Sequence, residues 1–144
     1  MRKSITQSHG YGCGLACVAF VARVEYAQVI EISDEVRAVA RGFYCKQLIQ
    51  LLYSYGYSGS FKHLKRSMIY KNKIYRDNTI VFIRRSKSHP AGHYLVRHQG
   101  FWMDPWLNFT ADKQIRNARS GYRRRLPGQP LYAIFTKRIT SEWL

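Results

Sequence analysis

The chain has 144 residues, a length typical of one domain and sufficient to bury a substantial core. Hydrophobic residues make up 46% of the chain and aromatic residues 15%, which excludes a disordered polymer. Lys and Arg number 24 and Asp and Glu only 8, so the formal net charge is +16. This balance argues against a calcium-binding protein or a nuclease with many carboxylates, and it predicts a surface that attracts anions.

The sequence has few signals of export. No stretch reaches the roughly 18 apolar residues that a membrane span requires, and the apolar run at 14–22 lacks the cleavage site of a signal peptide. The cysteines are odd in number, which argues against a disulfide framework; they are Cys13, Cys17 and Cys45. We therefore expect a cytoplasmic protein, with delivery as an effector as the alternative.

The first half of the chain is predicted to be helical. Residues 13–24 are apolar nearly all round, which is typical of a central, buried helix. A second helix is expected over about 26–40 and a third over about 45–55, each with an apolar face. The apolar face of the second helix consists of Val29, Ile32, Val36 and Val39.

The second half is predicted to form strands. Short runs rich in β-branched and aromatic residues lie at 80–83, 93–98, 101–106 and 131–136. Helices followed by antiparallel strands indicate a single α+β domain over residues 1–144.

The first candidate for chemistry is a cysteine at the start of the first predicted helix. Glycines surround Cys13 in the segment Gly10–Gly14. The N-terminus of a helix has unpaired N–H groups and a positive end, and both stabilise a thiolate. Cys13 is therefore the candidate nucleophile, whereas Cys17, one turn later, is expected to pack in the core.

A thiolate needs a base and a group that orients the base. His93 begins one predicted strand and Asp104 lies on the next, with Gln99 and Gly100 between the two strands. A two-residue turn there makes Asp104 the diagonal neighbour of His93 on one face, where the side chains can meet. A three-residue turn would put Asp104 on the opposite face.

These segments resemble a known family. Gln7, six residues before Cys13, is a candidate oxyanion donor together with the backbone N–H of Cys13. The order of Gln7, Cys13–Cys17, Gly92–Val96 and Asp104–Pro105 resembles the papain-like cysteine peptidases that process the double-glycine leaders of bacteriocins. The resemblance covers about residues 5–136.

The resemblance implies a papain-like fold and a role for each matching residue. Cys13 would be the nucleophile, His93 the base and Asp104 the group that orients the base, with Gln7 in the oxyanion hole. It also implies a polypeptide substrate, such as a leader peptide, and a bacterial or phage source. The chain departs from the family at Gly12, where members usually have an acidic residue, and in its charge of +16.

A zinc site is the alternative for some of these residues. His9, Cys13 and Cys17 recur at spacings of four, and His89 and His93 do the same. Structural zinc prefers close Cys-x-x-Cys pairs on turns, with four ligands. We therefore expect neither a metal nor another cofactor.

Two alternative functions remain. Basic residues gather in the second half of the chain, and the candidate anion-binding residues are Arg84, Arg85, Arg123, Arg124 and Arg125. Arginines interleaved with tyrosines suit phosphates and bases, and an acidic protein or an anionic membrane surface fits equally well. One alternative is thus a basic binding module on the same fold. The other is a papain-fold toxin that deamidates a glutamine of a protein.

Overall fold

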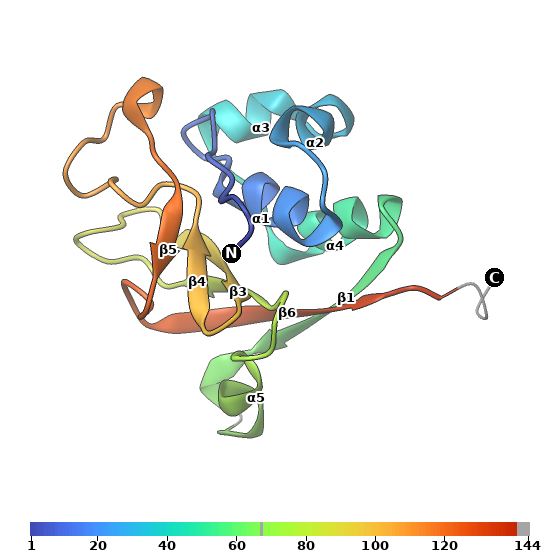
Figure 1. Cartoon of the computed structure of the whole chain (residues 1–144). Helices are drawn as coiled ribbons and strands as arrows, with labels where there is room; N and C mark the ends of the chain where they lie inside the picture. Colours follow the sequence, from blue (N-terminus) through green and yellow to red (C-terminus); the bar gives the residue numbers. More distant parts are fainter. Residues whose placement is uncertain (67, 141–144) are drawn as a thin grey trace.

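The structure is a computed structural model that describes residues 1–66 and 68–140 (Figure 1). The helical elements are α1 (Cys13–Ala22), α2 (Tyr26–Ile32), α3 (Glu35–Ala40), α4 (Cys45–Ser54), η1 (Leu64–Arg66), α5 (Met68–Lys73) and η2 (Ile115–Asn117). The strands are β1 (Tyr57–His63), β2 (Ile80–Ile83), β3 (His93–His98), β4 (Phe101–Asp104), β5 (Gly121–Arg123) and β6 (Pro130–Arg138). The predicted α+β class is confirmed.

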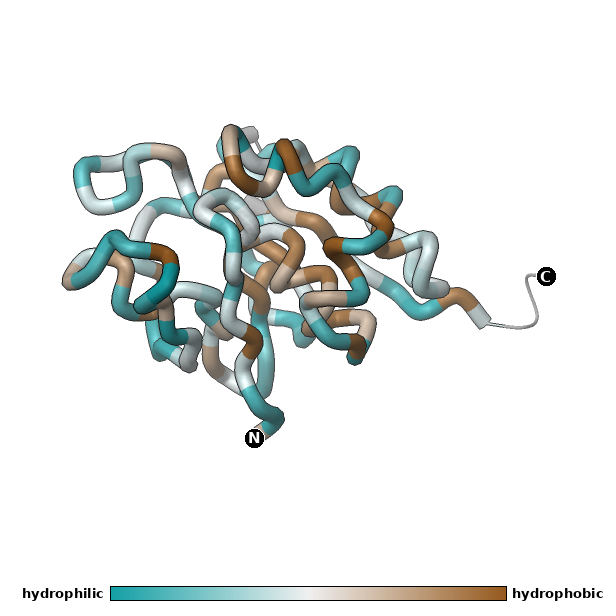
Figure 2. Tube along the Cα trace, turned by 90° about the horizontal axis from the view of Figure 1, so that it is seen from above, coloured by the Kyte–Doolittle hydropathy of each residue, from teal (hydrophilic) through white to brown (hydrophobic). Residues whose placement is uncertain are grey.

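The strands form one antiparallel sheet in the order β1-β6-β2-β3-β4-β5. Helix α1 packs on β3, and α4 packs on β1 and on α1. In Figure 1, α1 to α4 lie together on one side of the sheet and α5 lies on the other. Figure 2 shows that the apolar segments gather in the middle of the molecule, between more hydrophilic loops.

Both faces of the sheet are buried. The larger core joins α1, α2 and α4 to the sheet, and residues 15–20 of α1 have no exposed surface. A smaller core lies on the opposite face and consists of Leu64, Ile74, Val81, Ile83, Leu95, Trp102 and Ala133. Because α1 is enclosed on nearly all sides, its N-terminus is held in a fixed place above β3.

A glycine lets α1 begin this close to its neighbours. A Cβ added at Gly14 would lie 2.8 Å from Cδ1 of Leu48 on α4 and 3.1 Å from Cδ2 of Tyr94 on β3. Both distances are shorter than an ordinary van der Waals contact. Any larger residue at this position would push the start of α1, and with it Cys13, away from the sheet.

The predicted helix over 26–40 is two helices. The chain breaks at Ser33 and Asp34, where the Asp34 carboxylate accepts a hydrogen bond from the backbone N–H of Arg37 and caps α3. The predicted apolar face is also wrong in part. Val29 is buried, but the exposed fractions of Ile32, Val36 and Val39 are 51%, 74% and 61%. In α3, after the break, Ala38 is the buried residue, and Val36 and Val39 face away from the core.

The hairpin of β3 and β4 has the predicted register. Gln99 and Gly100 both have positive φ, at 47° and 84°, and form a two-residue turn that places His98 opposite Phe101. Strand β4 ends at Asp104, two residues earlier than expected, and β6 is longer than expected. The polar strands β1 and β5 and helix α5 were not predicted from the sequence.

None of the helices within the described residues is by itself long and apolar enough to cross a bilayer. Only α1 and α2 taken together, with a 112° bend between them, would pass such a test of length and composition.

Candidate active site

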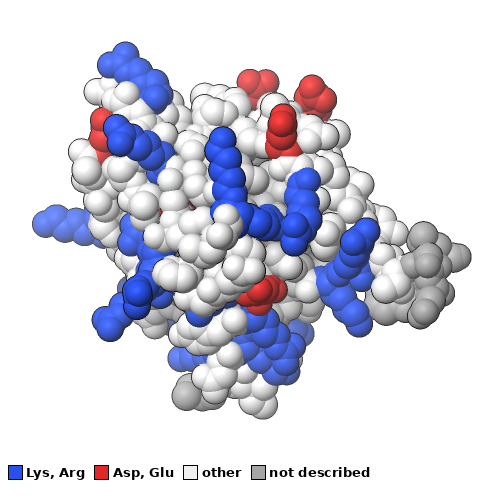
Figure 3. Space-filling model, viewed as in Figure 1, with Lys and Arg blue, Asp and Glu red and all other residues white. Residues whose placement is uncertain are grey.

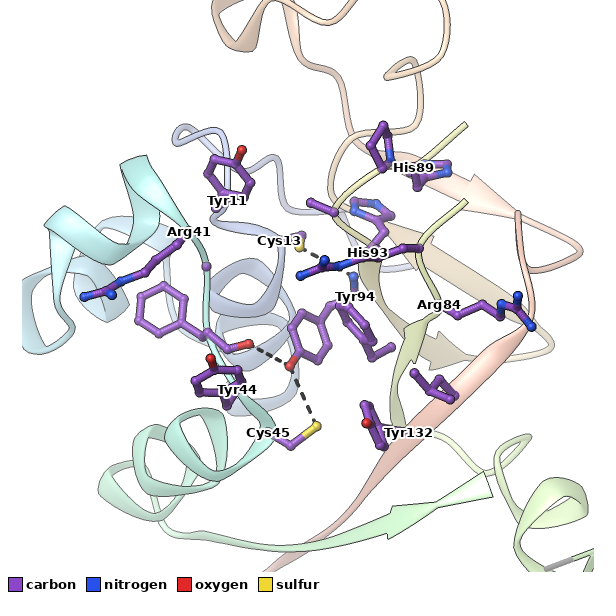
Figure 4. Close-up of a pocket in the computed structure, with 18 of the residues that line it drawn as sticks. Tyr11, Cys13, Arg41, Tyr44, Cys45, Arg84, His89, His93, Tyr94 and Tyr132 are labelled. Carbon is purple, nitrogen blue, oxygen red and sulfur yellow. Dashed lines mark hydrogen bonds between the residues drawn. The ribbon is translucent and has the colours of Figure 1, made fainter. Parts of the chain in front are cut away.

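Cys13 is the first residue of α1 and is partly exposed in a cleft of about 1080 Å³ (Figure 4). The cleft is bounded by α3 and the start of α4 on one side, and by the ends of β2, β3 and β6 on the other. The sulfur accepts a hydrogen bond from the backbone N–H of Tyr94, at 3.5 Å. Cys13 is therefore attached to both α1 and β3, with its sulfur accessible from the cleft.

His93 joins this cysteine to Asp104. The Nε2 atom of His93 lies 2.6 Å from Oδ1 of Asp104, and both side chains are buried. An interaction with the Cys13 side chain also contributes to the raised pKa of this imidazole. Because Nε2 is bonded to Asp104, Nδ1 is the ring nitrogen that remains for Cys13. The three predicted side chains thus form one chain of contacts, and Figure 4 shows Cys13 next to His93.

Asp104 is held by more than His93. Its Oδ1 accepts a second hydrogen bond from the backbone N–H of Trp106, at 2.9 Å, and its Oδ2 accepts one from Nε of Arg123, at 2.8 Å. Its side chain has no exposed surface. Both carboxylate oxygens are therefore satisfied, and the acceptor for His93 is fixed in position.

These contacts decide the charges of the pair. Burial by itself would raise the pKa of Asp104, but the charge and hydrogen bond of His93, with the donors Trp106 and Arg123, lower that pKa to about 2. Burial would likewise lower the pKa of His93, but the charge and hydrogen bond of Asp104 and the interaction with Cys13 raise it to about 10. At neutral pH the site therefore contains an imidazolium beside the Cys13 sulfur.

Gln7 is also brought to the cleft. Its side chain is 1% exposed, and its backbone N–H donates to the carbonyl of Pro105, at 3.2 Å. However, its amide Nε2 donates to the carbonyls of His9 (3.0 Å) and Gly10 (3.3 Å), while its Oε1 has no partner among the described residues. Its role as an oxyanion donor therefore stays a prediction.

His89 also lines the cleft, although its sequence pattern pointed only to the zinc alternative. Its ring is 2% exposed and stacks on the ring of His93, with centroids 5.1 Å apart, while Phe109 stacks on it at 5.2 Å. Burial, together with the charge of His93, lowers the pKa of His89 to about 4. His89 is thus a neutral aromatic wall beside the charged His93. Its spacing of four from His93 was the only sequence signal.

The other two cysteines lie in the core. Cys17 is fully buried, and burial raises its pKa well above the ordinary value. Cys45 is 7% exposed, burial raises its pKa too, and its sulfur lies 3.7 Å from the hydroxyl of Tyr94. Only Cys13 combines partial exposure with contact to a histidine.

The structure divides the five candidate anion-binding arginines. Arg84 and Arg85 line the cleft. Arg123 is instead bonded to Asp104, and the guanidinium of Arg124 lies over the ring of Phe101, 5.9 Å from its centroid. Arg125 is exposed outside the cleft. Anion binding by these residues stays a prediction.

The residues weighed as zinc ligands do not gather around one point. His9 bonds to the hydroxyl of Tyr26 at 2.9 Å and to the carboxylate of Glu35 at 3.2 Å, on α2 and α3. Within residues 1–66 and 68–140, no group of three His, Cys, Asp or Glu side chains is placed to hold a metal ion.

Comparison with known proteins supports the fold. No protein-family model matches the chain, and no curated protein matches it. Among solved structures, the chain is similar to the peptidase domain of Streptococcus ComA, a bi-functional ABC transporter involved in a quorum sensing pathway. The match has a TM-score of 0.62 and 16% sequence identity, and it covers 97% of this chain and 100% of that domain. The chain therefore has the papain-like fold that the resemblance implied.

Proposed function

We propose that residues 1–144 form one cysteine peptidase domain with Cys13 as nucleophile, His93 as general acid and base, and Asp104 as the residue that orients His93. One observation carries the proposal: His93 contacts the Cys13 side chain and, through its other nitrogen, a buried and fully bonded carboxylate. The similarity to a peptidase domain supports an amide bond of a polypeptide, such as a leader peptide, as the target.

The reaction follows from the positions of these groups. The thiolate of Cys13 attacks the carbonyl carbon and forms a C–S bond, and the carbonyl oxygen becomes an oxyanion. The free N–H groups at the start of α1 are one source of donors for this oxyanion. The amide of Gln7 is a second donor once it releases the carbonyl of Gly10.

The leaving amine must take a proton before the C–N bond breaks. His93, charged at neutral pH, supplies that proton. The C–N bond then breaks, the amine departs, and the acyl group remains on Cys13 as a thioester. The neutral imidazole then takes a proton from water, whose oxygen attacks the thioester carbon. The carboxylic acid product departs, and the thiolate and the imidazolium are restored.

A departure from the family at position 12 has a steric reason in this chain. A Cβ at Gly12 would lie 2.1 Å from the hydroxyl oxygen of Tyr26. An acidic side chain, usual at this position in the family, would therefore displace Tyr26 and its bond to His9. Gly12 keeps the segment before Cys13 close to α2.

The test is selective alkylation of the three cysteines. Iodoacetamide at neutral pH should modify Cys13 alone in the folded protein, as read from intact mass and peptide mapping. Cys13→Ala should abolish the fast modification, whereas Cys17→Ala and Cys45→Ala should leave it unchanged. Equal labelling of all three cysteines, or labelling of none, would contradict the proposal.

The same geometry would also let Cys13 attack the side-chain amide of a glutamine. Substrates trapped on Cys13 separate the two reactions, since hydrolysis of a backbone amide divides the polypeptide, whereas deamidation leaves it whole and about one mass unit heavier. We expect two fragments.

A further inference from the structure

We infer that the cleft around Cys13 selects polypeptide segments rich in acidic side chains; this rests on the proposed peptidase function and specifies its substrate. The inference comes from the charges that line the cleft. Its basic residues are Arg37, Arg41, Lys46, Arg84, Arg85 and Lys113. No Asp or Glu is among the residues that line it.

The charges of these six side chains are not neutralised within the described part of the chain. The ion pairs found there join His9 to Glu35, His93 to Asp104 and Arg123 to Asp104, and none includes a cation of the cleft. Exposed cations gathered without counterions repel one another. An anionic occupant would therefore be attracted to this cleft.

Contacts with uncharged groups hold two of these cations, Arg37 and Arg84, in place. Arg37 donates from Nε to the carbonyl of Gly42, at 2.8 Å, and its guanidinium lies 5.1 Å from the ring centroid of Tyr44. Arg84 donates to Oε1 of Gln129, at 3.3 Å. These contacts restrict the side chains without removing their charge, so that less conformational entropy is lost when they bind an anion.

The cations lie on both sides of the nucleophile. Arg37, Arg41 and Lys46 belong to α3 and α4 or to their junction, whereas Arg84 and Arg85 follow β2. Figure 4 shows Arg41 and Arg84 on opposite sides of Cys13 and His93. A chain that passes over Cys13 would therefore run between two positive rims, and acidic side chains on either side of it would find partners.

The same imbalance is visible on the surface. Figure 3 shows Lys and Arg spread over most of the viewed face, while Asp and Glu are few and lie mainly over α2 and α3. Over distances greater than about 8 Å, physiological salt screens such charges. The cations of the cleft, which surround the reacting sulfur, are therefore expected to affect selectivity more than the remaining ones.

A peptide fits the cleft better than a nucleic acid. Between the cations the lining is largely aromatic and apolar, with Phe43, Phe82, Trp106 and Tyr132 among its residues. Aromatic rings could also stack on bases. However, the cations surround a thiol that lies beside an imidazole (Figure 4), and this pair is suited to attack on a carbonyl carbon.

Three peptide vinyl sulfones provide the test, identical except for two side chains that are Glu, Gln or Lys. The Cys13 sulfur adds to the β-carbon of the vinyl group and the α-carbon takes a proton, so each reaction adds the mass of one probe. The second-order rate is read by intact mass. We expect the Glu probe to react at least about tenfold faster than the Gln probe and the Lys probe to be slowest, with the ratio falling several-fold from 50 to 500 mM NaCl.

Charge reversal locates the selectivity. In the double variant Arg84→Glu with Arg85→Glu, the ratio of the Glu rate to the Gln rate should fall to about one or below. The matched control is Arg76→Glu with Arg138→Glu, which changes the net charge equally at exposed positions outside the cleft. The control should keep the ratio within about twofold of the wild-type value. The iodoacetamide rate and the melting temperature of each variant show whether it is folded.

Each other outcome overturns the inference in a distinct way. Equal rates for the three probes in the wild type would mean that the cleft ignores charge, while Cys13 remains the nucleophile. A control variant that loses as much selectivity as the cleft variant would mean that overall charge steers the probes. If single-stranded DNA blocked labelling at lower concentration than poly-glutamate, the occupant would be a nucleic acid. If no probe labelled Cys13, the proposed function itself would fail.

Discussion

Replacing Asp104 by asparagine tests the electrostatics of the site. The remaining carbonyl oxygen can still accept from His93 and Trp106, but the new NH2 group faces the guanidinium of Arg123, where the carboxylate accepted a hydrogen bond. Two donors then oppose each other, and Arg123 loses its counterion. Removing one member of a buried ion pair typically costs about 3–5 kcal/mol. Arg123 is 25% exposed, so water screens part of this loss and we expect about 3 kcal/mol.

The larger effect is expected on His93. Asp104 raises the pKa of His93 to about 10 against the opposing effect of burial, so removing the carboxylate should let this pKa fall to 6.5 or below. Loss of the imidazolium proton removes the acid that protonates the leaving group. The alkaline limb of the pH–rate profile should therefore move down by at least about three pH units.

Two measurements check these expectations. Release of p-nitroaniline from a peptide p-nitroanilide, followed between pH 5 and 10.5, reports the alkaline limb, because this leaving amine needs the proton of His93. Urea unfolding at several pH values reports stability. The raised pKa of His93 contributes stability that is complete below pH 6.5 and is lost as the pH rises toward 10. The lowered pKa of Asp104 contributes stability that is complete above about pH 3.8 and is lost as the pH falls toward 2. Wild type and variant should thus differ most between pH 4 and 6.5.

A second variant separates structure from charge. Asp104→Asn combined with Arg123→Gln removes the unpaired cation and offers the asparagine amide an acceptor, so stability should recover while the alkaline limb stays low. An unchanged alkaline limb in Asp104→Asn, or a loss of stability below about 1 kcal/mol, would refute the electrostatic reasoning.

Two further predictions concern the surroundings of His93. Gly92→Ala should lower the free energy of unfolding in urea by roughly 1–3 kcal/mol more than Gly100→Ala, and it should slow alkylation of Cys13. Both glycines have positive φ, but only at Gly92 would a Cβ lie 2.2 Å from Cζ of Phe82. Equal losses of stability in the two variants would contradict this reasoning. His89→Phe should keep the stack on His93, and the free energy of unfolding of this variant should depend less on pH below pH 6.5 than that of the wild type. The pKa of His89 is lowered to about 4, so its stabilising effect is complete above pH 6.5 and declines as the pH falls toward 4, by up to about 3 kcal/mol. Parallel urea midpoints for wild type and variant from pH 7 to 4.5 would be the contrary result.

Local sequence patterns were sufficient to place the candidate nucleophile and the hairpin that carries its proposed base. The glycines around Cys13 and the apolar run after it predict a buried helix with a cysteine at its N-terminus, which is where α1 begins. The dipeptide at 99–100 sets the turn, and the alternation of side chains along β3 and β4 then sets the face of His93 and Asp104. These features depend on residues close to one another in the chain, so they could be read without a structure.

The partners of the proposed triad were decided by the tertiary structure. Arg123 reaches Asp104 only because β5 joins the edge of the sheet. Strand β5 is short and half-buried, and its sequence has no pattern that predicts a strand. His89 stacks on His93 because the loop after β4 brings Phe109 against it. The break at Asp34 likewise exposes Val36, although its spacing predicted burial. The contacts of Arg123 and Phe109 join distant segments, whereas helical or strand periodicity reports only the neighbours within one element. The break at Asp34 is a local cap that the apolar spacing did not indicate.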